Sequence, residues 1–220
     1  MKKSESAQLA AFMIPGIAEA GCDEAGRGCL CGPVSCAAVI LGSDFDGTGL
    51  NDSKQLSAPE RRELRIRIER DALAWAVVMV DACEIDRINI LNASIAGMHR
   101  ALDALSIRPA HILVDGNRFK PYLDPEKMMD IPHHTIVKGD AKFLSIAAAS
   151  ILAKTHRDEL MEQLAGEYPG YGWERNMGYP TKEHLAAIGK LGITPVHRLT
   201  FRGVKELVIS QTDTQVRHKG

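Results

Sequence analysis

Short apolar runs alternate along the chain with charged or glycine-rich stretches. Two such runs lie between Ile17 and Leu41, joined by a glycine-containing segment, and this pattern predicts a hairpin of buried strands. A valine-rich run at residues 74–80 predicts a further strand. From Leu91 to Leu105 the apolar residues recur at helical spacing, which predicts a helix that faces the core. This alternation of strands and helices indicates an α/β fold with a mixed sheet.

Three more helices have recognisable starts or compositions. Residues 57–60 form a capping-box pattern, so a helix is expected to begin there. The stretch from Ser145 to Gly166 is rich in small apolar residues at first and amphipathic later, which predicts a long helix whose opening packs closely against the sheet. Thr181 is placed to cap a helix over residues 182–191.

The composition, with 45% hydrophobic and 25% charged residues, is that of a globular protein, and 220 positions fit one domain or one domain plus a small appendage. A formal net charge of −1 gives no overall sign of nucleic-acid binding, which is usually a property of basic proteins. A nucleic-acid partner would therefore have to be held by a local patch of cationic side chains.

The cysteines and the N-terminal residues favour a cytoplasmic protein. Five cysteines, an odd number placed mostly in apolar runs, favour reduced and buried thiols. Cys29 and Cys31 have no second Cys or His pair at the spacing of a zinc site. The N-terminus imitates a secretory signal, but Pro15 and Gly16 interrupt its apolar part. No run of about 18 apolar residues is present, so no membrane span is expected.

Acidic residues follow three of the apolar runs, each time near a glycine. Asp23 and Glu24 end the first run, and Asp115 and Asp140 follow two later ones. A buried carboxylate needs a cationic partner, and a hard divalent metal ion supplies one. One such acid would be a turn residue, whereas three run ends with acids suggest that the ends converge. The alternative is a hairpin whose acids are solvated at its tip.

The glycines beside the first acids matter for this site. Neighbouring side chains of a strand point to opposite faces, so Asp23 and Glu24 face one ion only where the pleat breaks. Gly26 and Gly28 are expected to supply that break, and they let backbone N–H groups approach a ligand closely. Acids beside exposed amides predict a metal site next to a phosphate or sugar site.

Cationic residues offer further candidate contacts. Lys54 lies in the loop before the helix at residue 58, where it could reach a phosphate, although a solvated loop lysine is the commoner case. Lys154 lies within about one helical turn of Arg157 and Asp158, which suits either a structural ion cluster or a phosphate contact. The charges around Arg61 are expected to form a solvated helix face.

These candidates belong to an ordered set of motifs that covers nearly the whole chain, from about Ile17 to Phe201. The motifs are Asp23-Glu24-Ala25-Gly26-Arg27-Gly28, Gly32-Pro33-Val34, Asn51-Asp52-Ser53-Lys54, Val114-Asp115-Gly116, Lys138-Gly139-Asp140, residues 148–154 with Arg157-Asp158, Gly178-Tyr179-Pro180-Thr181 and His197-Arg198. In this order they resemble ribonuclease HII, the bacterial type 2 ribonuclease H. The resemblance implies a ribonuclease H-like α/β fold, with a mixed central sheet flanked by helices and a C-terminal helical segment.

The expected organisation is one catalytic domain over residues 17–209, whose C-terminal helical part covers about 167–209. Flexible tails are expected at residues 1–16 and 210–220. The size of the chain and its lack of a heptad pattern or an exposed apolar signature favour a monomer.

The resemblance also implies a metal-dependent reaction. Asp23, Glu24, Asp115 and Asp140 look like the family carboxylates that hold two divalent metal ions. Oxygen-only ligands suit Mg²⁺ or Mn²⁺. Two such ions can activate the attacking water and stabilise the departing 3′ oxygen. The implied substrates are RNA–DNA hybrids, cut in the RNA strand, and duplex DNA with single ribonucleotides, cut on their 5′ side. The implied products carry a 5′-phosphate and a 3′-hydroxyl.

The substrate contacts come from the same resemblance. Gly26-Arg27-Gly28 is similar to the family loop that reads the 2′-OH through its backbone, the group that marks RNA. Tyr179 looks like the family tyrosine that packs on the sugar. Lys54, Lys154, His197 and Arg198 are candidate phosphate contacts or local structure. Met177 stands where the family often has lysine.

Two other functions stay open at this point. One is a related metal-dependent nuclease with another substrate or polarity, which would not need the glycine loop together with the tyrosine. The other is a catalytically silent hybrid-binding module, which the presence of all four acids disfavours.

Overall fold

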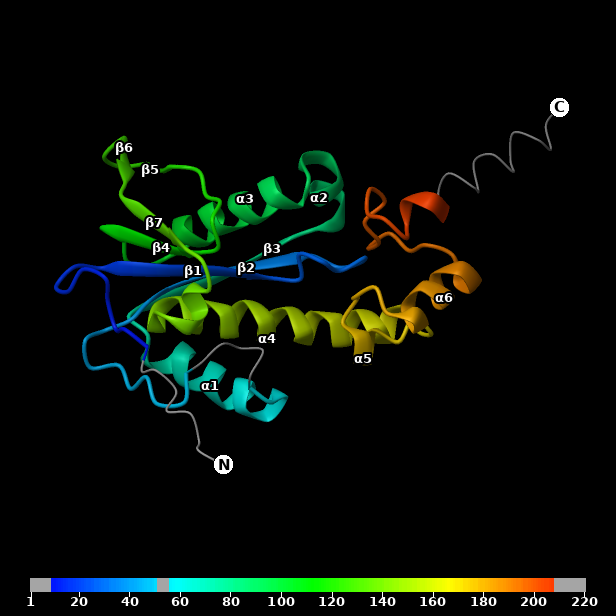
Figure 1. Cartoon of the computed structure of the whole chain (residues 1–220), viewed down its shortest axis with the longest axis horizontal. Coiled ribbons are helices and arrows are strands. Elements are labelled where there is room, and N and C mark those ends of the chain that lie inside the picture. The colour runs from blue at the N-terminus through cyan, green and yellow to red at the C-terminus, as the bar shows by residue number, and fades with distance from the viewer. Residues whose placement is uncertain (1–8, 51–55, 208–220) are drawn as a thin grey trace.

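The computed structural model describes residues 9–50 and 56–207. A five-stranded sheet of order β3-β2-β1-β4-β7 forms its centre, with helices on both faces (Figure 1). Its strands are β1 (Glu19–Ala25), β2 (Val34–Ile40), β3 (Ala74–Val80), β4 (His111–Asp115) and β7 (His133–Ile136). The helices are α1 (Ala58–Asp71), α2 (Ala82–Ile88), α3 (Ile90–Asp103), α4 (Leu144–Glu167), α5 (Trp173–Asn176) and α6 (Lys182–Leu191).

The strand directions confirm the predicted mixed sheet. β1 and β2 form the expected antiparallel hairpin, in register from Ala20 opposite Ile40 to Ala25 opposite Ser35. β4 runs parallel to both β1 and β7. The carboxyl ends of these three parallel strands therefore lie at the same edge of the sheet.

Helices cover both faces of the sheet, so β2 is buried on both sides. Ala38 packs in a cluster with Met98 of α3, whereas Val39 packs in a second cluster with Leu152 of α4. Burial of one large apolar side chain contributes roughly 1.5–3 kcal/mol, and these two clusters are the main source of it. α1 adds Ile68 to the second cluster and so lies on the same side of the sheet as α4.

The opening of α4 lies directly against β1, as its small residues predict. A Cβ added to Gly21 of β1 would lie 2.2 Å from the backbone carbon of Ser145. Residues 147–149 are fully buried alanines that permit this approach. The contact fixes α4 relative to the strand that carries the first two acids.

Helix starts follow the predicted caps. Ser57 and Glu60 complete a capping box at α1, with the Ser57 N–H donating to Glu60 Oε2 at 2.7 Å. The Thr181 hydroxyl oxygen accepts from the N–H of His184 at 3.1 Å and begins α6. Each such cap stabilises its helix by about 1 kcal/mol.

Some elements were not predicted. α2 is a short helix that Asp81 caps, and the proline-bounded loop holds a small ribbon of β5 (Tyr122–Asp124) and β6 (Met129–Ile131). Asp140 does not end a strand, because a 3₁₀ turn, η1 (Gly139–Ala141), follows β7 and contains it. Elements this short have no hydrophobic period of their own, so pattern alone does not find them.

The C-terminal helical segment is confirmed and has its own apolar cluster. Trp173, fully buried, stacks on Tyr171 with ring centroids 4.9 Å apart. Met161 of α4 and Ile188 of α6 pack in the same cluster. The segment is thereby joined to the far end of the helix that lies against β1.

Residues 9–16, assigned above to a loose tail, are held by the core in part. The Ala10 N–H donates to the Lys142 carbonyl at 2.8 Å, and the Leu144 N–H donates to the Ala10 carbonyl at 3.0 Å. The Met13 N–H donates to the buried Glu19 carboxylate at 2.9 Å. The expected tails at residues 1–8 and 210–220 lie outside the described residues.

The cysteines are free, and four of the five are buried, whereas Cys83 is exposed. Burial raises the pKa of the Cys31 thiol to about 12, so it stays protonated at neutral pH. We therefore expect the native protein to react with one equivalent of a thiol reagent and the denatured protein with five. Absorbance titration with and without denaturant measures both values, and Cys83→Ser should remove the native reaction. Fast labelling of several thiols in the native protein would contradict the buried placement.

Among the residues described, no helix is both long enough and apolar enough to cross a membrane.

Candidate active site

A cavity of about 260 Å³ opens at the sheet edge where β1 and β4 end. It gathers acids, glycines, cations and one aromatic ring from segments far apart in the sequence. Its lining residues are Asp23, Glu24, Ala25, Gly26, Arg27, Gly28, Arg61, Asp115, Ser150, Lys154 and Tyr179. Three of the four predicted carboxylates thus share one cavity with the predicted glycine loop and tyrosine.

Glu24 lies before the pleat break that was predicted to let it face the same ion as Asp23. β1 stays paired with β2 through Glu24 opposite Cys36 and Ala25 opposite Ser35, so the strand includes both acids. The Asp23 carboxylate instead turns along the strand, where its Oδ1 accepts the Glu24 N–H at 2.7 Å. Pairing with β2 keeps the backbone extended up to the glycines.

Asp23 is a buried acid of the cavity with a strongly raised pKa. Burial raises its pKa well above the ordinary value, and the nearby charges of Glu24 and Asp115 raise it further. Hydrogen bonds from the Ser150 hydroxyl and the Glu24 N–H oppose this rise only in part. Like charges that burial brings together in this way are stabilised by a cation between them.

A hydrogen bond joins the Asp115 side chain to the backbone of Gly139, the residue before Asp140. Asp115 Oδ1 accepts the Gly139 N–H at 2.7 Å, which fixes η1 beside the end of β4. Asp140 is buried in that turn and is not among the residues that line the cavity. Its role as a metal ligand therefore stays a prediction.

The donor set fits a hard divalent cation. Asp23, Glu24 and Asp115 offer carboxylate oxygens, which Mg²⁺ and Mn²⁺ prefer. Burial, together with the charges of Glu24 and Asp115, raises the pKa of Asp23, and a bound cation would offset both effects. These three residues could hold the metal, with Asp140 next to them through Gly139.

The glycine loop borders the acids. Gly26 has a φ of +90°, a conformation that favours glycine, and Gly28 has open space where a side chain would stand. The Arg27 side chain, 48% exposed, forms an ion pair with Glu24 at 3.0 Å. A ligand can therefore approach the backbone at Gly28 directly.

Tyr179 and Lys154 also line the cavity. The Tyr179 ring is 40% exposed, and the Lys154 ammonium lies 5.9 Å from its centroid. Lys154 also pairs with Asp158 at 2.7 Å. The ion pair agrees with the structural interpretation of Lys154, and its place in the cavity lining leaves the phosphate contact a prediction.

His197 and Arg198 are not among the residues that line the cavity, and their burial favours local structure over phosphate contacts, the two roles left open above. Both are fully enclosed, with 1% and 0% exposure. Arg198 donates to the Gly32 and Arg27 carbonyls, each at 3.0 Å, and so holds the backbone of the glycine loop. Lys54 lies outside the described residues.

Sequence reasoning missed two residues of the cavity. Arg61 was taken for part of a solvated helix face, but the packing of α1 on α4 brings it to the cavity wall. Ser150 hydrogen-bonds Asp23, although serine in an alanine-rich helix gave no signal of its own. Its spacing of four residues from Lys154 places both on one helix face, and that spacing was the available clue.

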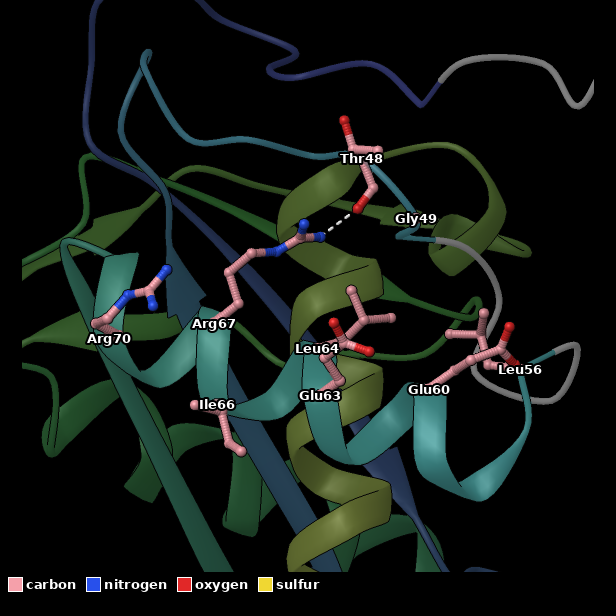
Figure 2. Close-up of a pocket in the computed structure, with 9 residues that line it drawn as sticks. All are labelled: Thr48, Gly49, Leu56, Glu60, Glu63, Leu64, Ile66, Arg67 and Arg70. Atoms are coloured by element: carbon pink, nitrogen blue, oxygen red, sulfur yellow. Dashed lines mark hydrogen bonds between the residues drawn. The ribbon is translucent and has the colours of Figure 1, made fainter.

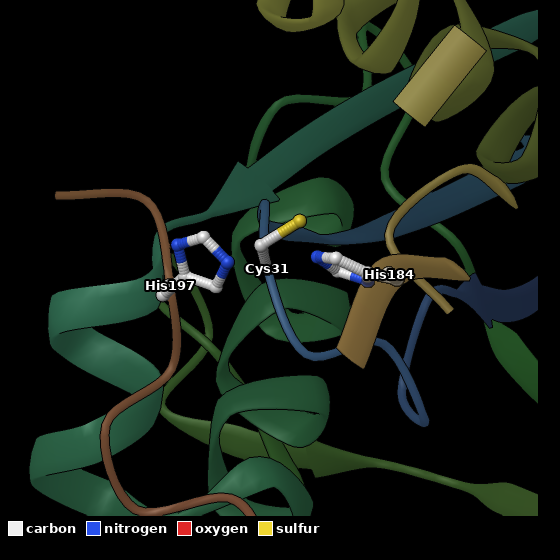
Figure 3. A group of neighbouring side chains, drawn as sticks. All are labelled: Cys31, His184 and His197. Carbon is white, nitrogen blue, oxygen red and sulfur yellow. The ribbon is translucent and has the colours of Figure 1, made fainter. Parts of the chain in front are cut away.

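A second cluster, Cys31, His184 and His197, lies in the C-terminal core with donor atoms within 4.8 Å of one another (Figure 3). His184 uses both nitrogens already. Nε2 accepts from the Trp173 indole at 2.9 Å, and Nδ1 donates to the Tyr179 carbonyl at 2.9 Å. A metal ion would have to break one of these bonds, so we assign the cluster to holding the turn that carries Tyr179.

Another hollow, of about 390 Å³, lies along α1 (Figure 2). There the Arg67 guanidinium donates to the Thr48 carbonyl. Leu56 and Leu64 supply apolar parts of its lining. Among the described residues it shares no lining residue with the acidic cavity, so it does not extend that site.

Comparisons with known proteins agree with this geometry. The family model of Ribonuclease HII matches residues 20–204. A Bacteroides fragilis protein named Ribonuclease HII is 63% identical over 183 residues, which cover 83% of this chain and 88% of that protein.

Solved structures agree as well. The crystal structure of the ribonuclease H2 from Pyrococcus horikoshii OT3 superposes with a TM-score of 0.71 at 27% identity, over 86% of this chain and 96% of that one. Bst-RNase HIII in complex with Mn²⁺ shares the fold, with a TM-score of 0.63 at 21% identity over 88% of this chain and 70% of that one. The chain belongs to the ribonuclease HII family and is a metal-dependent ribonuclease H.

Proposed function

We propose that this enzyme hydrolyses the RNA strand of RNA–DNA hybrids and also cuts on the 5′ side of single ribonucleotides embedded in duplex DNA. Its products would carry a 5′-phosphate and a 3′-hydroxyl. Such an activity serves ribonucleotide and primer removal, and so genome maintenance. The observation that carries the proposal is that three carboxylates, the glycine loop and an exposed tyrosine line one cavity.

Each wall of that cavity has a part in the proposed reaction. Asp23, Glu24 and Asp115, with Asp140 behind them, would hold two divalent ions. Bound ions would supply the activated water and stabilise the departing 3′ oxygen. The Ser150 hydroxyl orients Asp23 from α4. Lys154 stands where its ammonium can attract a phosphate.

Recognition of RNA is proposed for the loop and the ring together. At Gly28 the backbone is open to a ligand, so its polar groups can contact a 2′-OH, the group that distinguishes RNA from DNA. The Tyr179 ring lines the same cavity and could pack on the sugar beside it. Arg27, next in the loop, can exchange its pairing with Glu24 for a substrate phosphate.

We further propose that the enzyme uses Mn²⁺ or Mg²⁺ and works as a monomer in the cytoplasm. The oxygen donors of the cavity suit both ions. A solved relative with the same fold was crystallised with Mn²⁺.

The activity test uses three duplexes of one sequence: a continuous RNA–DNA hybrid, duplex DNA with a single ribonucleotide, and all-DNA. We expect cleavage of the first two only, dependent on added Mn²⁺ or Mg²⁺ and lost with chelator. End analysis should find a 5′-phosphate and a 3′-hydroxyl. Cleavage of the all-DNA duplex, or no cleavage of either ribonucleotide-containing duplex with either ion, would overturn the proposal.

Tyr179→Ala should lose roughly tenfold in kcat/KM on the single-ribonucleotide duplex, since aromatic contacts of this kind contribute about 1–3 kcal/mol for stacked bases. The loss on the continuous hybrid should be smaller, because neighbouring registers there offer other 2′-OH groups. Both substrates are compared at one salt concentration. Tyr168→Ala is the matched control, because that half-buried tyrosine does not line the cavity. Equal losses on both substrates would leave Tyr179 a structural residue of its turn.

A further inference from the structure

Arg157 lies buried in α4 at 1% exposure and joins two loops that the sequence keeps far apart. Its Nε donates to the Pro33 carbonyl at 2.9 Å, and one terminal nitrogen donates to the Cys31 carbonyl at 3.1 Å. The other terminal nitrogen donates to the Met177 carbonyl at 2.9 Å. One planar group therefore holds both the segment that follows the glycine loop and the turn just before Tyr179.

The same guanidinium supports Gly26 directly. A Cβ at Gly26 would lie 2.0 Å from Arg157 Nε, so the missing side chain is what lets the arginine lie against the loop. Gly26 also has a φ of +90°. Glycine is therefore required here for two reasons: the turn needs a positive φ, and the Arg157 side chain occupies the space of a Cβ.

The two loops also contact each other around this arginine. The Leu30 N–H donates to the Gly178 carbonyl at 2.8 Å. A Cβ at Gly178 would lie 2.9 Å from the Cys31 carbonyl oxygen. Loop and turn therefore form one layer, and Arg157 contributes bonds to both of its halves.

We propose that Arg157 is a positioning residue that sets the spacing between the glycine loop and the Tyr179 ring and thereby determines selectivity for a single ribonucleotide. This inference rests on the function proposed above. One embedded ribonucleotide must meet the loop and the ring at the same nucleotide, so an error in their spacing removes one of the two contacts. A continuous hybrid offers a 2′-OH in every register and tolerates the error better.

Arginine is needed because its rigid fork presents several donors at fixed angles. Lysine keeps the charge but carries its donors on a single nitrogen, and it cannot reach three separated carbonyls in that geometry. Arg157→Lys should therefore loosen the spacing while leaving the carboxylates and the ring in place.

The test measures kcat and KM for both ribonucleotide-containing duplexes at a temperature well below unfolding. The unfolding temperature of each variant is measured separately. For Arg157→Lys we expect kcat/KM on the single-ribonucleotide duplex to fall at least tenfold more than on the continuous hybrid. Gly178→Ala should cause the same imbalance, because it separates loop and turn without altering the arginine. Ile188→Ala is the control for lost stability, since this buried residue of α6 packs in the same C-terminal cluster.

A structural role alone would lower both activities in proportion to the folded fraction. An unchanged substrate ratio in both Arg157→Lys and Gly178→Ala, or an equal change of ratio in Ile188→Ala, would overturn the inference. Failure of the wild-type enzyme to cut either duplex with metal present is a different result, because it removes the proposed function itself.

Discussion

Asp23→Asn is expected to reduce cleavage of an RNA–DNA hybrid by roughly a thousandfold or more, since lost metal stabilisation of the transition state is worth several kcal/mol. Hybrid binding should change little, because affinity for nucleic acid rests mainly on phosphate contacts. Turnover at saturating Mg²⁺ and binding by fluorescence anisotropy separate the two effects. Near-normal turnover of the variant would remove Asp23 from the metal site.

The same substitution should stabilise the metal-free protein. The pKa of Asp23 is raised in the folded state, so the folded protein holds this proton more tightly than the unfolded chain, whose acid has its ordinary pKa near 3.8. Stability is therefore lost as the pH rises above that ordinary value, until the folded-state pKa is passed. Asparagine has no proton to lose and avoids this penalty. The gain should be at least about 1 kcal/mol at neutral pH, or roughly 2–4 °C in unfolding temperature.

Thermal unfolding with chelator, at neutral pH and near pH 4, measures this gain and its decline in acid. Asp46→Asn is the matched control, because hydrogen bonds from Thr48 lower the pKa of that exposed acid. The expected effect on stability is therefore opposite in sign to that of Asp23→Asn. Asp46→Asn should be neutral or slightly destabilised, with normal activity. A lower unfolding temperature for metal-free Asp23→Asn at neutral pH would contradict the electrostatic account of the site.

The sequence was sufficient for features that are encoded locally. The β1–β2 hairpin, the capped starts of α1 and α6, and the acids near glycines all depend on residues close together in the sequence. The proximity of Asp23 and Asp115 could be predicted because parallel strands end at one edge of a sheet.

Features that depend on distant segments could not be derived this way. Arg157 and Arg198 look like ordinary cations in the sequence, yet they bind carbonyls more than a hundred positions away and are buried. Arg61 belongs to a charge-rich helix surface, and only the packing of α1 against α4 turns it toward the cavity. Burial of a charged side chain is decided by tertiary contacts, which periodicity does not report.

Gly21→Ala is expected to destabilise the protein by about 3 kcal/mol, at the upper end of the usual effect of overpacking a core. The added Cβ would lie 2.2 Å from the Ser145 backbone carbon and 2.4 Å from the Ile146 nitrogen. Backbone atoms cannot rotate away, so α4 as a whole must move from β1. The unfolding temperature should fall by roughly 6–12 °C for a chain of this size, as differential scanning calorimetry can measure.

The displacement of α4 should also affect the active site. This helix carries Ser150, whose hydroxyl hydrogen-bonds Asp23, and Asp23 lies two residues after Gly21 in β1. We expect turnover to fall even at temperatures where Gly21→Ala is fully folded. Gly166→Ala is the control: it lies exposed in the last turn of the same helix, with nothing within 4 Å of the added Cβ. Alanine suits a helix better than glycine, so this variant should gain up to about 1 kcal/mol and keep normal turnover. If Gly21→Ala were as stable as the wild type, the close approach of β1 and α4 would be wrong, and with it the route by which the helix positions Asp23.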